Sequence, residues 1–134
     1  MVELVWDADR LGTATAPSGA TMTVGEHAHF SPDDLLAMAA ASCLMRTFLR
    51  LADEGAARIL SYAATAQAAP ACASDAAPHV TIHAYLVAPA GTDTRDLEDR
   101  FRRSTQVSPI TRLLGDRVTA TAEVRVLRAA NRAG

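Results

Sequence analysis

The chain has 134 residues and a mass of 14.1 kDa, which is the size of one ordinary domain spanning 1–134. Its composition, 49% hydrophobic and 21% charged, is typical of a folded globular protein and excludes an intrinsically disordered one. The net charge of −2 and the pI near 6.0 argue against nucleic acid as a partner, because they leave no basic surface to neutralise phosphates.

The N-terminal part of the chain favours short strands. Alternating apolar residues in 2–6 precede the polar stretch 7–12, which predicts a strand and then a turn. Residues 13–24 carry Thr, Met and Val on both sides of the turn signal Pro17-Ser18-Gly19, which predicts further strands. We therefore expect a β-meander, followed by a loop over 25–30.

The clearest predicted element is a helix that begins after Ser31. Ser31 can act as the N-cap, Pro32 suits the first helical turn, and the acids that follow favour the positive end of the helix dipole. The helix should run about six turns to Glu54. Gly55 is expected to supply the left-handed residue with which helices commonly end.

The first half of this helix is apolar on every side. Residues 35–45 place Leu, Ala and Met at all angles around the axis, so no single amphipathic stripe accounts for them. We expect this half to be buried all round. Past Arg46 charged and apolar residues alternate, which predicts that the second half emerges toward water.

The remaining chain predicts two strands, two helices and a closing strand, with 70–78 connecting the first two strands. In chain order we expect a strand at 57–67, a strand at 79–88, a helix from Asp93 to about Ser104, a short helix from Ser108 to Gly115, and a strand at 118–126. Strands and helices mixed in this order predict an α+β fold.

Neither a membrane span nor a disulfide scaffold is expected. The apolar run 35–45 is shorter than the roughly 20 residues that cross a bilayer. Acids follow Met1 where a secretory signal would carry basic residues, so the sequence predicts a cytoplasmic protein. Two cysteines, Cys43 and Cys72, are too few for a disulfide framework and lack C-x-x-C spacing, so any reactive thiol must act singly.

The four histidines do not predict a metal site. His79 and His83 are four residues apart on an expected strand, which separates them by about 13 Å. His27 and His29 lack a third ligand at suitable spacing. We expect no metal and no cofactor.

Cys43 lies in the apolar half of the helix, where a free cysteine is most often a small buried hydrophobe. The residues around it indicate more. The helix start Ser31-Pro32-Asp33-Asp34-Leu35-Leu36-Ala37, followed by Ala41-Ser42-Cys43-Leu44, resembles the signature of the OsmC/Ohr family of thiol peroxidases. In that signature a Pro-acid-x-Leu-Leu helix start leads to a reactive cysteine in an Ala-rich helix, and the order of elements agrees over essentially the whole chain.

The resemblance implies both a fold and an activity. The fold is an antiparallel β-sheet wrapped around the long cysteine-bearing helix, in an intertwined homodimer whose partner covers the apolar half of that helix. The activity is that of a peroxidase acting on small organic hydroperoxides. Cys43 attacks the peroxide as a thiolate, becomes a sulfenic acid, and is reduced by an external thiol.

The resemblance also implies roles for Arg10 and Asp33. Family members carry an Arg just before a Gly in the N-terminal turn, where Arg10 and Gly12 stand here, and a Glu orienting it, where this chain has the shorter Asp33. Along one helix Asp33 and Cys43 are about 15 Å apart. A shared site therefore implies that elements of two chains combine. Solvated charges at a turn and at a helix start remain the alternative for both residues.

The main departure from the family is Ser108, which stands where peroxidase members carry a resolving cysteine before proline. Serine forms no disulfide, so the resemblance implies a one-cysteine peroxidase. Ser108 itself is expected to cap the short helix. Cys72 is expected to be an incidental loop thiol, with a role as replacement partner as the alternative.

The missing cysteine also favours a second hypothesis, a non-catalytic protein of the same fold that binds a small apolar ligand beside Cys43. A third hypothesis is a scaffold for another protein, for which an exposed apolar patch would be the mark.

Overall fold

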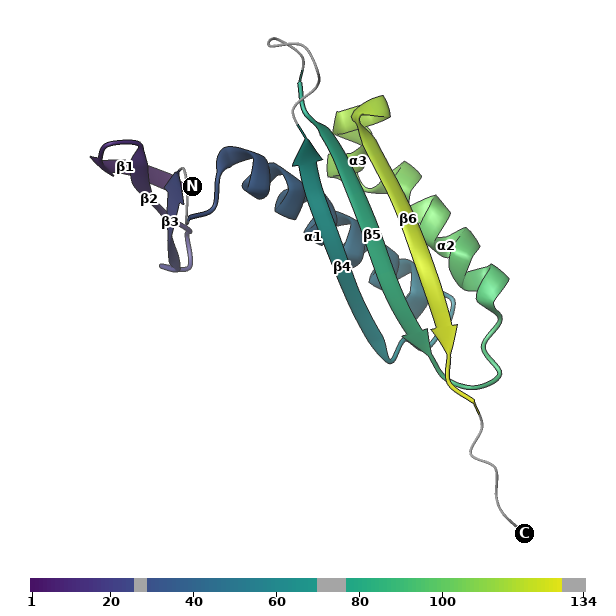
Figure 1. Ribbon diagram of the computed structural model, residues 1–134. Helices are drawn as coiled ribbons and strands as arrows, with labels where there is room; N and C mark the ends of the chain where they lie inside the picture. The colour runs from purple at the N-terminus through teal and green to yellow at the C-terminus, as the bar shows by residue number, and fades with distance from the viewer. Residues whose placement is uncertain (26–28, 70–76, 129–134) are drawn as a thin grey trace.

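The computed structural model describes residues 1–25, 29–69 and 77–128. Its strands form two three-stranded sheets, ordered β1-β2-β3 and β4-β5-β6 (Figure 1). The elements in chain order are β1 Glu3–Ala8, β2 Leu11–Thr15, β3 Thr21–Gly25, α1 Pro32–Glu54, β4 Ser61–Ala69, β5 His79–Ala88, α2 Thr94–Val107, α3 Pro109–Leu114, the 3₁₀ turn η1 Gly115–Arg117 and β6 Val118–Val126. The predicted α+β class is confirmed.

The predicted meander is present and stands apart from the rest of the chain. Strands β1, β2 and β3 pair antiparallel, and Figure 1 shows them joined to the remaining elements through the start of α1. Every residue of β1 is exposed. Leu4 is 65% and Trp6 74% accessible to solvent. Within one chain β1 therefore leaves its apolar side chains in solvent, and Leu11, Met22 and Val24 of the other two strands are only half-buried.

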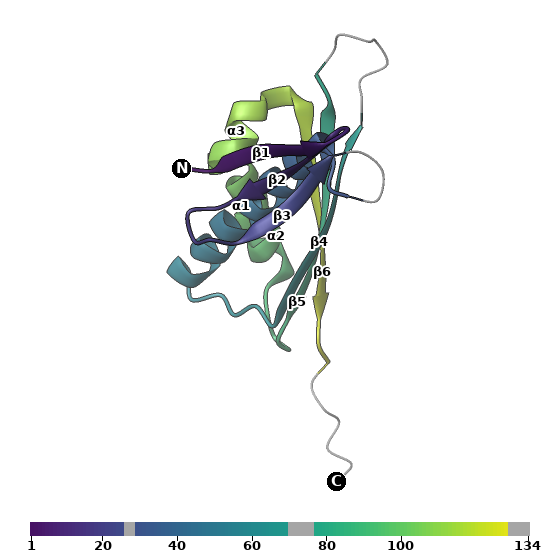
Figure 2. The same cartoon turned by 90° about the vertical axis from the view of Figure 1, so that its left-hand side faces the viewer.

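The remaining elements form a two-layer body with its own core. Figure 2 shows β4, β5 and β6 nearly edge-on, with the helices on one side of the sheet. The inward-facing residues of β5 alternate with exposed ones, as its pattern predicted. At the centre the Phe48 ring lies 5.9 Å from Tyr62 and 5.8 Å from Phe101. The fully buried apolar residues include Leu44, Phe48, Val80, Ile82, Leu86 and Leu97.

One pairing differs from the expected antiparallel sheet. Strands β5 and β6 run parallel, whereas β4 and β5 run antiparallel. The chain from β5 to β6 passes through α2 and α3, and such a crossover over one face of the sheet returns the next strand in the same direction. A short hairpin would have given the antiparallel pairing.

The start of α1 and its end at Glu54 are as predicted, but the conformation of the capping residue Gly55 is not. Ser31 Oγ accepts from the Asp34 backbone N–H at 3.1 Å, and the Asp34 carboxylate accepts from the Ser31 N–H at 3.0 Å, which makes a capping box. Gly55 does not adopt a left-handed conformation, since its φ is −92°, and Ala56 has the positive φ of 53° instead. A Cβ on Gly55 would collide with the guanidinium of Arg100. A side chain at this position would therefore require the guanidinium of Arg100 to move.

The burial of the first half of α1 on every side stays a prediction, since it involves a partner chain, whereas the expectation for the second half is wrong. The first half is covered on one side, by contacts of Ala37, Ala40 and Leu44, while Met38 is 45% exposed. The second half, expected to emerge toward water, contains the fully buried Phe48. The reason is that the first turns of α1 project past the sheet toward the meander, whereas the later turns pack against the sheet and alongside α2 (Figure 1).

By length and composition α1 would pass as a membrane span, with a mean hydropathy of 1.5. Its buried residues pack against β5 and α2. In the described structure α1 is thus a central helix of the core.

The observed bounds of β4 and α2 differ from the predicted ones. Strand β4 begins at Ser61, because the backbone N–H groups of Ala56 and Ala57 still bond to carbonyls of α1. Helix α2 continues to Val107, and α3 and β6 are as predicted. Most of the expected connection 70–78 lies outside the described residues.

Candidate active site

Cys43 lies in the middle of α1, half-buried, on the side of the helix that faces α3. The hydroxyl of Ser108 donates to the Cys43 sulfur at 3.1 Å. The two residues are 65 positions apart in sequence. Tertiary structure thus places the candidate nucleophile beside Ser108. This is the residue that stands where peroxidases of the resembled family carry their second cysteine.

Ser108 does not cap α3, contrary to the sequence prediction. It occupies the N-cap position, but its side chain makes no capping hydrogen bond. The reason is geometric. Its N–H donates to the Ser104 carbonyl at 2.9 Å and its own carbonyl accepts from Arg112 N–H at 2.9 Å, so the backbone is held between two helices. The fully buried hydroxyl then turns toward the sulfur.

This hydrogen bond suits a thiolate better than a thiol. A hydroxyl that donates to an ionised acceptor forms a bond roughly twice as strong as one to a neutral acceptor. Ser108 is fully buried, so bulk water does not compete for its hydroxyl. The nucleophilic form of a cysteine is the thiolate, and the Ser108 hydroxyl is placed to donate to the sulfur of that form.

A groove of about 720 Å³ opens onto Cys43. One wall is α1 and the other is the junction of α2 and α3. Its lining residues are Ala39, Ser42, Cys43, Arg46, Thr47, Arg50, Val107, Pro109 and Ile110. A small molecule can thus approach the sulfur from solvent. Arg46 and Arg50 were not singled out from the sequence, although their spacing of three and seven residues from Cys43 places them on its side of the helix.

Arg10 and Asp33 do not join Cys43 within the chain. Arg10 is exposed at the turn between β1 and β2, and it lines a different cavity of about 510 Å³. That cavity lies between the meander and the start of α1, with Trp6 and Leu35 among its walls. Asp33 is exposed in the first turn of α1. Whether the two residues serve a catalytic site stays a prediction.

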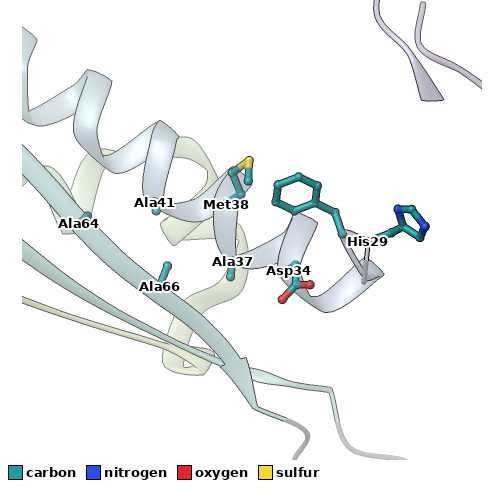
Figure 3. Close-up of a pocket in the computed structure, with 8 residues that line it drawn as sticks. His29, Asp34, Ala37, Met38, Ala41, Ala64 and Ala66 are labelled. Atoms are coloured by element: carbon teal, nitrogen blue, oxygen red, sulfur yellow. The ribbon is translucent and has the colours of Figure 1, made fainter. Parts of the chain in front are cut away.

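A further cavity of about 530 Å³ lies between the start of α1 and β4. Figure 3 shows Ala37 and Ala41 of the helix facing Ala64 and Ala66 of the strand. Because all four side chains are methyl groups, they leave the seam between helix and strand open. His29, Asp34 and Met38 lie at its outer end (Figure 3). This cavity could not be predicted from the sequence, because apolar composition does not distinguish alanine from larger apolar side chains.

The histidines of β5 bond to threonines of β6. His79 Nε2 lies 2.8 Å from Thr119 Oγ1, and His83 Nδ1 lies 2.7 Å from Thr121 Oγ1. Among the described residues no group of three metal-ligating side chains gathers, and His27 lies outside them. These histidines are cross-strand partners on the outer face of the sheet.

Residues 25–123 match the family described as OsmC-like protein. This chain belongs to that family. Among solved structures, an OsmC-like protein of unknown function from Vibrio cholerae has a TM-score of 0.77 at 16% identity, covering 93% of this chain and 97% of that one. The OsmC-like protein from Mycoplasma pneumoniae has a TM-score of 0.75 at 13% identity, covering 96% of each chain.

The fold is also that of hydroperoxide resistance proteins. OhrB of Bacillus subtilis, an organic hydroperoxide resistance protein, has a TM-score of 0.67 at 14% identity, covering 93% of this OsmC-like chain and 98% of its own. At such identities the likeness establishes the fold. No curated protein matches the chain. The resemblance stated from the helix motif is confirmed at the level of the family.

Proposed function

We propose that this OsmC-like protein is a thiol-dependent peroxidase that reduces small organic hydroperoxides through Cys43 without a resolving cysteine. The observation that carries the proposal is the hydrogen bond of 3.1 Å from Ser108 to the Cys43 sulfur, at the end of an open groove. It supplies a donor for a thiolate and access for a peroxide at the same atom. Family membership and the shared fold of hydroperoxide resistance proteins support it.

The chemistry follows from these groups. The Cys43 thiolate attacks the terminal oxygen of the hydroperoxide, an S–O bond forms, the O–O bond breaks, and the alkoxide leaves as an alcohol after taking up a proton. Cys43 is then a sulfenic acid. Ser108 has no thiol to condense with it, so an external thiol forms a mixed disulfide and releases water, and a second thiol restores Cys43.

The proposal includes an intertwined homodimer. The meander leaves Leu4 and Trp6 exposed, and the first half of α1 leaves Met38 exposed, although both segments are apolar. A second copy that covers them would also carry its Arg10 and Asp33 toward the Cys43 of this chain. In this arrangement Arg10 stabilises the thiolate, Asp33 orients Arg10, and the whole chain acts as one domain in the cytoplasm.

The test is to trap the sulfenic acid. Reduced protein treated with one equivalent of cumene hydroperoxide should form an adduct with a sulfenic-acid reagent at Cys43, located by peptide mass spectrometry. A Cys72→Ser variant should behave like wild type, and Cys43→Ser should give no adduct.

A protein that binds a small apolar ligand beside Cys43 is the second candidate, favoured by the hydroxyl at the resolving position. Complete inertness of Cys43 toward hydroperoxide, with the groove still binding apolar probes, would replace the peroxidase proposal by this one.

A further inference from the structure

We propose that the thiol which reduces the oxidised Cys43 is a small anionic thiol, one that carries a carboxylate, and that Arg46 attracts it into the groove. The inference rests on the proposed function and names its second substrate by chemical class. It is carried by the charges that line the groove.

The groove presents one stripe of α1 to solvent. Successive helical residues are about 100° apart, so Arg46 and Arg50 fall within about 60° of Cys43 around the axis. Both arginines line the groove together with Cys43. With a rise of about 1.5 Å per residue, Arg46 starts only about 4.5 Å further along the helix than the nucleophile. Its long side chain thus borders the path to the sulfur.

The charges in the groove have one sign. Its lining includes two arginines and no acid among the described residues. Arg50 is already paired with Glu54, Nη1 to Oε1 at 2.8 Å. Arg46 makes no ion pair with any residue that the structure describes, and it is exposed. A chain with a net charge of −2 therefore holds an uncompensated cation beside its candidate nucleophile.

The opposite wall makes this charge selective. The side chains of Val107, Pro109 and Ile110 are apolar and carry no charge that would compete for the cation. A small anion between this wall and Arg46 would lose part of its screening by water, which strengthens its attraction to the cation. A neutral thiol gains nothing from Arg46, and a cationic thiol is repelled.

Reduction of the sulfenic acid is the step for which a second reactant, the thiol, must enter the groove. Ser108 occupies the side of the sulfur where a resolving cysteine would act within the chain. The sulfenic acid therefore waits for a thiol from solution. The incoming thiolate forms an S–S bond with Cys43, and the sulfenic hydroxyl leaves as water after taking up a proton. A second molecule of the same thiol then releases reduced Cys43 and a symmetric disulfide.

The experiment compares three thiols on preformed sulfenic acid. The Cys72→Ser protein is oxidised with cumene hydroperoxide and mixed with mercaptopropionate, mercaptoethanol or cysteamine, which are anionic, neutral and cationic at their far ends. The variants are Arg46→Gln and the matched control Arg103→Gln, an exposed arginine of α2 outside the groove lining. Dividing each variant rate by the wild-type rate with the same thiol cancels the intrinsic reactivity of that thiol.

At low ionic strength Arg46→Gln should slow the anionic thiol about three- to tenfold, and salt should shrink this difference because it screens the charge. The neutral thiol should change less than about twofold, the cationic thiol should react faster, and Arg103→Gln should change none of them. An equal loss for all three thiols, or no loss for the anionic one, would overturn the proposal. The proposal would also be overturned if Arg46→Gln slowed only the formation of the sulfenic acid, with a hydroperoxide that carries a carboxylate, and not its reduction.

A second measurement separates this inference from the proposed function. Reduced Cys43 also reacts with disulfides, and the anionic dithiobis(nitrobenzoate) and the neutral dithiodipyridine probe the groove without any peroxide. If no sulfenic acid forms, the proposed function fails. Even then, a slower reaction of the Arg46→Gln variant with the anionic disulfide alone would establish that the groove recognises anions. Equal rates of the variant and the wild type with that disulfide would overturn the recognition of anions too.

Discussion

The meander and the body of this chain are built from similarly apolar residues, yet they bury them very differently. In the body, Phe48, Ile82 and Leu97 are fully buried between one sheet and two helices. In the meander, three strands form a sheet with no layer packed on either face, and Trp6 remains 74% exposed. A sheet must cover at least one face to be stable in water. Among the described residues the body does so and the meander does not, which is why we propose that a second copy covers the meander.

The same contrast divides the candidate site. Cys43 and Ser108 belong to the body and already touch. Arg10 belongs to the meander and lines another cavity. The part of the site that depends on the core is complete in one chain, and the part that depends on the meander is not. The predictions below test this division, beginning with the largest expected effect.

Phe48→Ala should remove about 3 to 5 kcal/mol from the free energy of unfolding, because it opens a cavity among the aromatic rings of the body core. Urea denaturation measures this. Leu113→Ala is the control, since Leu113 is 80% exposed, and it should change stability by less than about 0.5 kcal/mol. Similar losses in both variants would mean that the body does not contain the stable core.

Trp6→Asp should leave the body folded and weaken self-association. Wild type should sediment as a dimer of about 28 kDa, twice the chain mass of 14.1 kDa. The variant should raise the dimer Kd by on the order of a hundredfold, because a central aromatic contact typically contributes about 2 kcal/mol or more to an interface. A wild-type monomer at micromolar concentration would remove the homodimer and, with it, the shared site.

Arg10→Ala should slow alkylation of Cys43 at neutral pH about tenfold, because one hydrogen-bonded charge is typically worth about 1.5 kcal/mol or more. Mixing variants then locates the arginine. Random exchange of Arg10→Ala with Cys43→Ser chains should restore about a quarter of the wild-type sites if Arg10 acts across the dimer. If mixing restored no fast-alkylating sites although the Arg10→Ala homodimer was alkylated slowly, Arg10 and the Cys43 that it serves would belong to the same chain.

Ser108→Cys should close a disulfide with Cys43 after peroxide treatment, since the two side chains already meet at 3.1 Å. Mass spectrometry should then show little sulfinic or sulfonic acid, whereas wild type should over-oxidise unless a small thiol is present. A disulfide between Cys43 and Cys72 in wild type would instead show that the loop carrying Cys72 reaches the site.

Tyr62→Phe should raise the free energy of unfolding by about 1 kcal/mol, because the Tyr62 hydroxyl is the one buried side-chain polar atom without a hydrogen-bond partner in the described residues. Burial also raises the pKa of Tyr62 from 10.0 to about 12. The unfolded chain loses this proton first, so the contribution of Tyr62 to wild-type stability should be constant below pH 10 and be lost as the pH rises toward 12. The variant should lack this loss, as thermal melts across that range would show.

The sequence by itself determined the elements and the family. Capping residues at Ser31 and Asp93 and strict alternation in β6 depend on local geometry, so each could be predicted without knowing its neighbours. The helix motif around Cys43 identified the OsmC-like family for the same reason, because all of its residues lie on one helix.

Only the tertiary structure decided which faces are covered and which residues meet. Gly55 caps α1 where the sequence predicted, but its φ of −92° is not left-handed, and the guanidinium of Arg100 lies beside it. Ser108 looked like a cap until the packing of α3 against α1 turned its hydroxyl to Cys43. Arg46 became part of a groove only once α2 and α3 supplied its second wall. These outcomes depend on contacts between residues far apart in sequence, and periodicity along the chain carries no information about them.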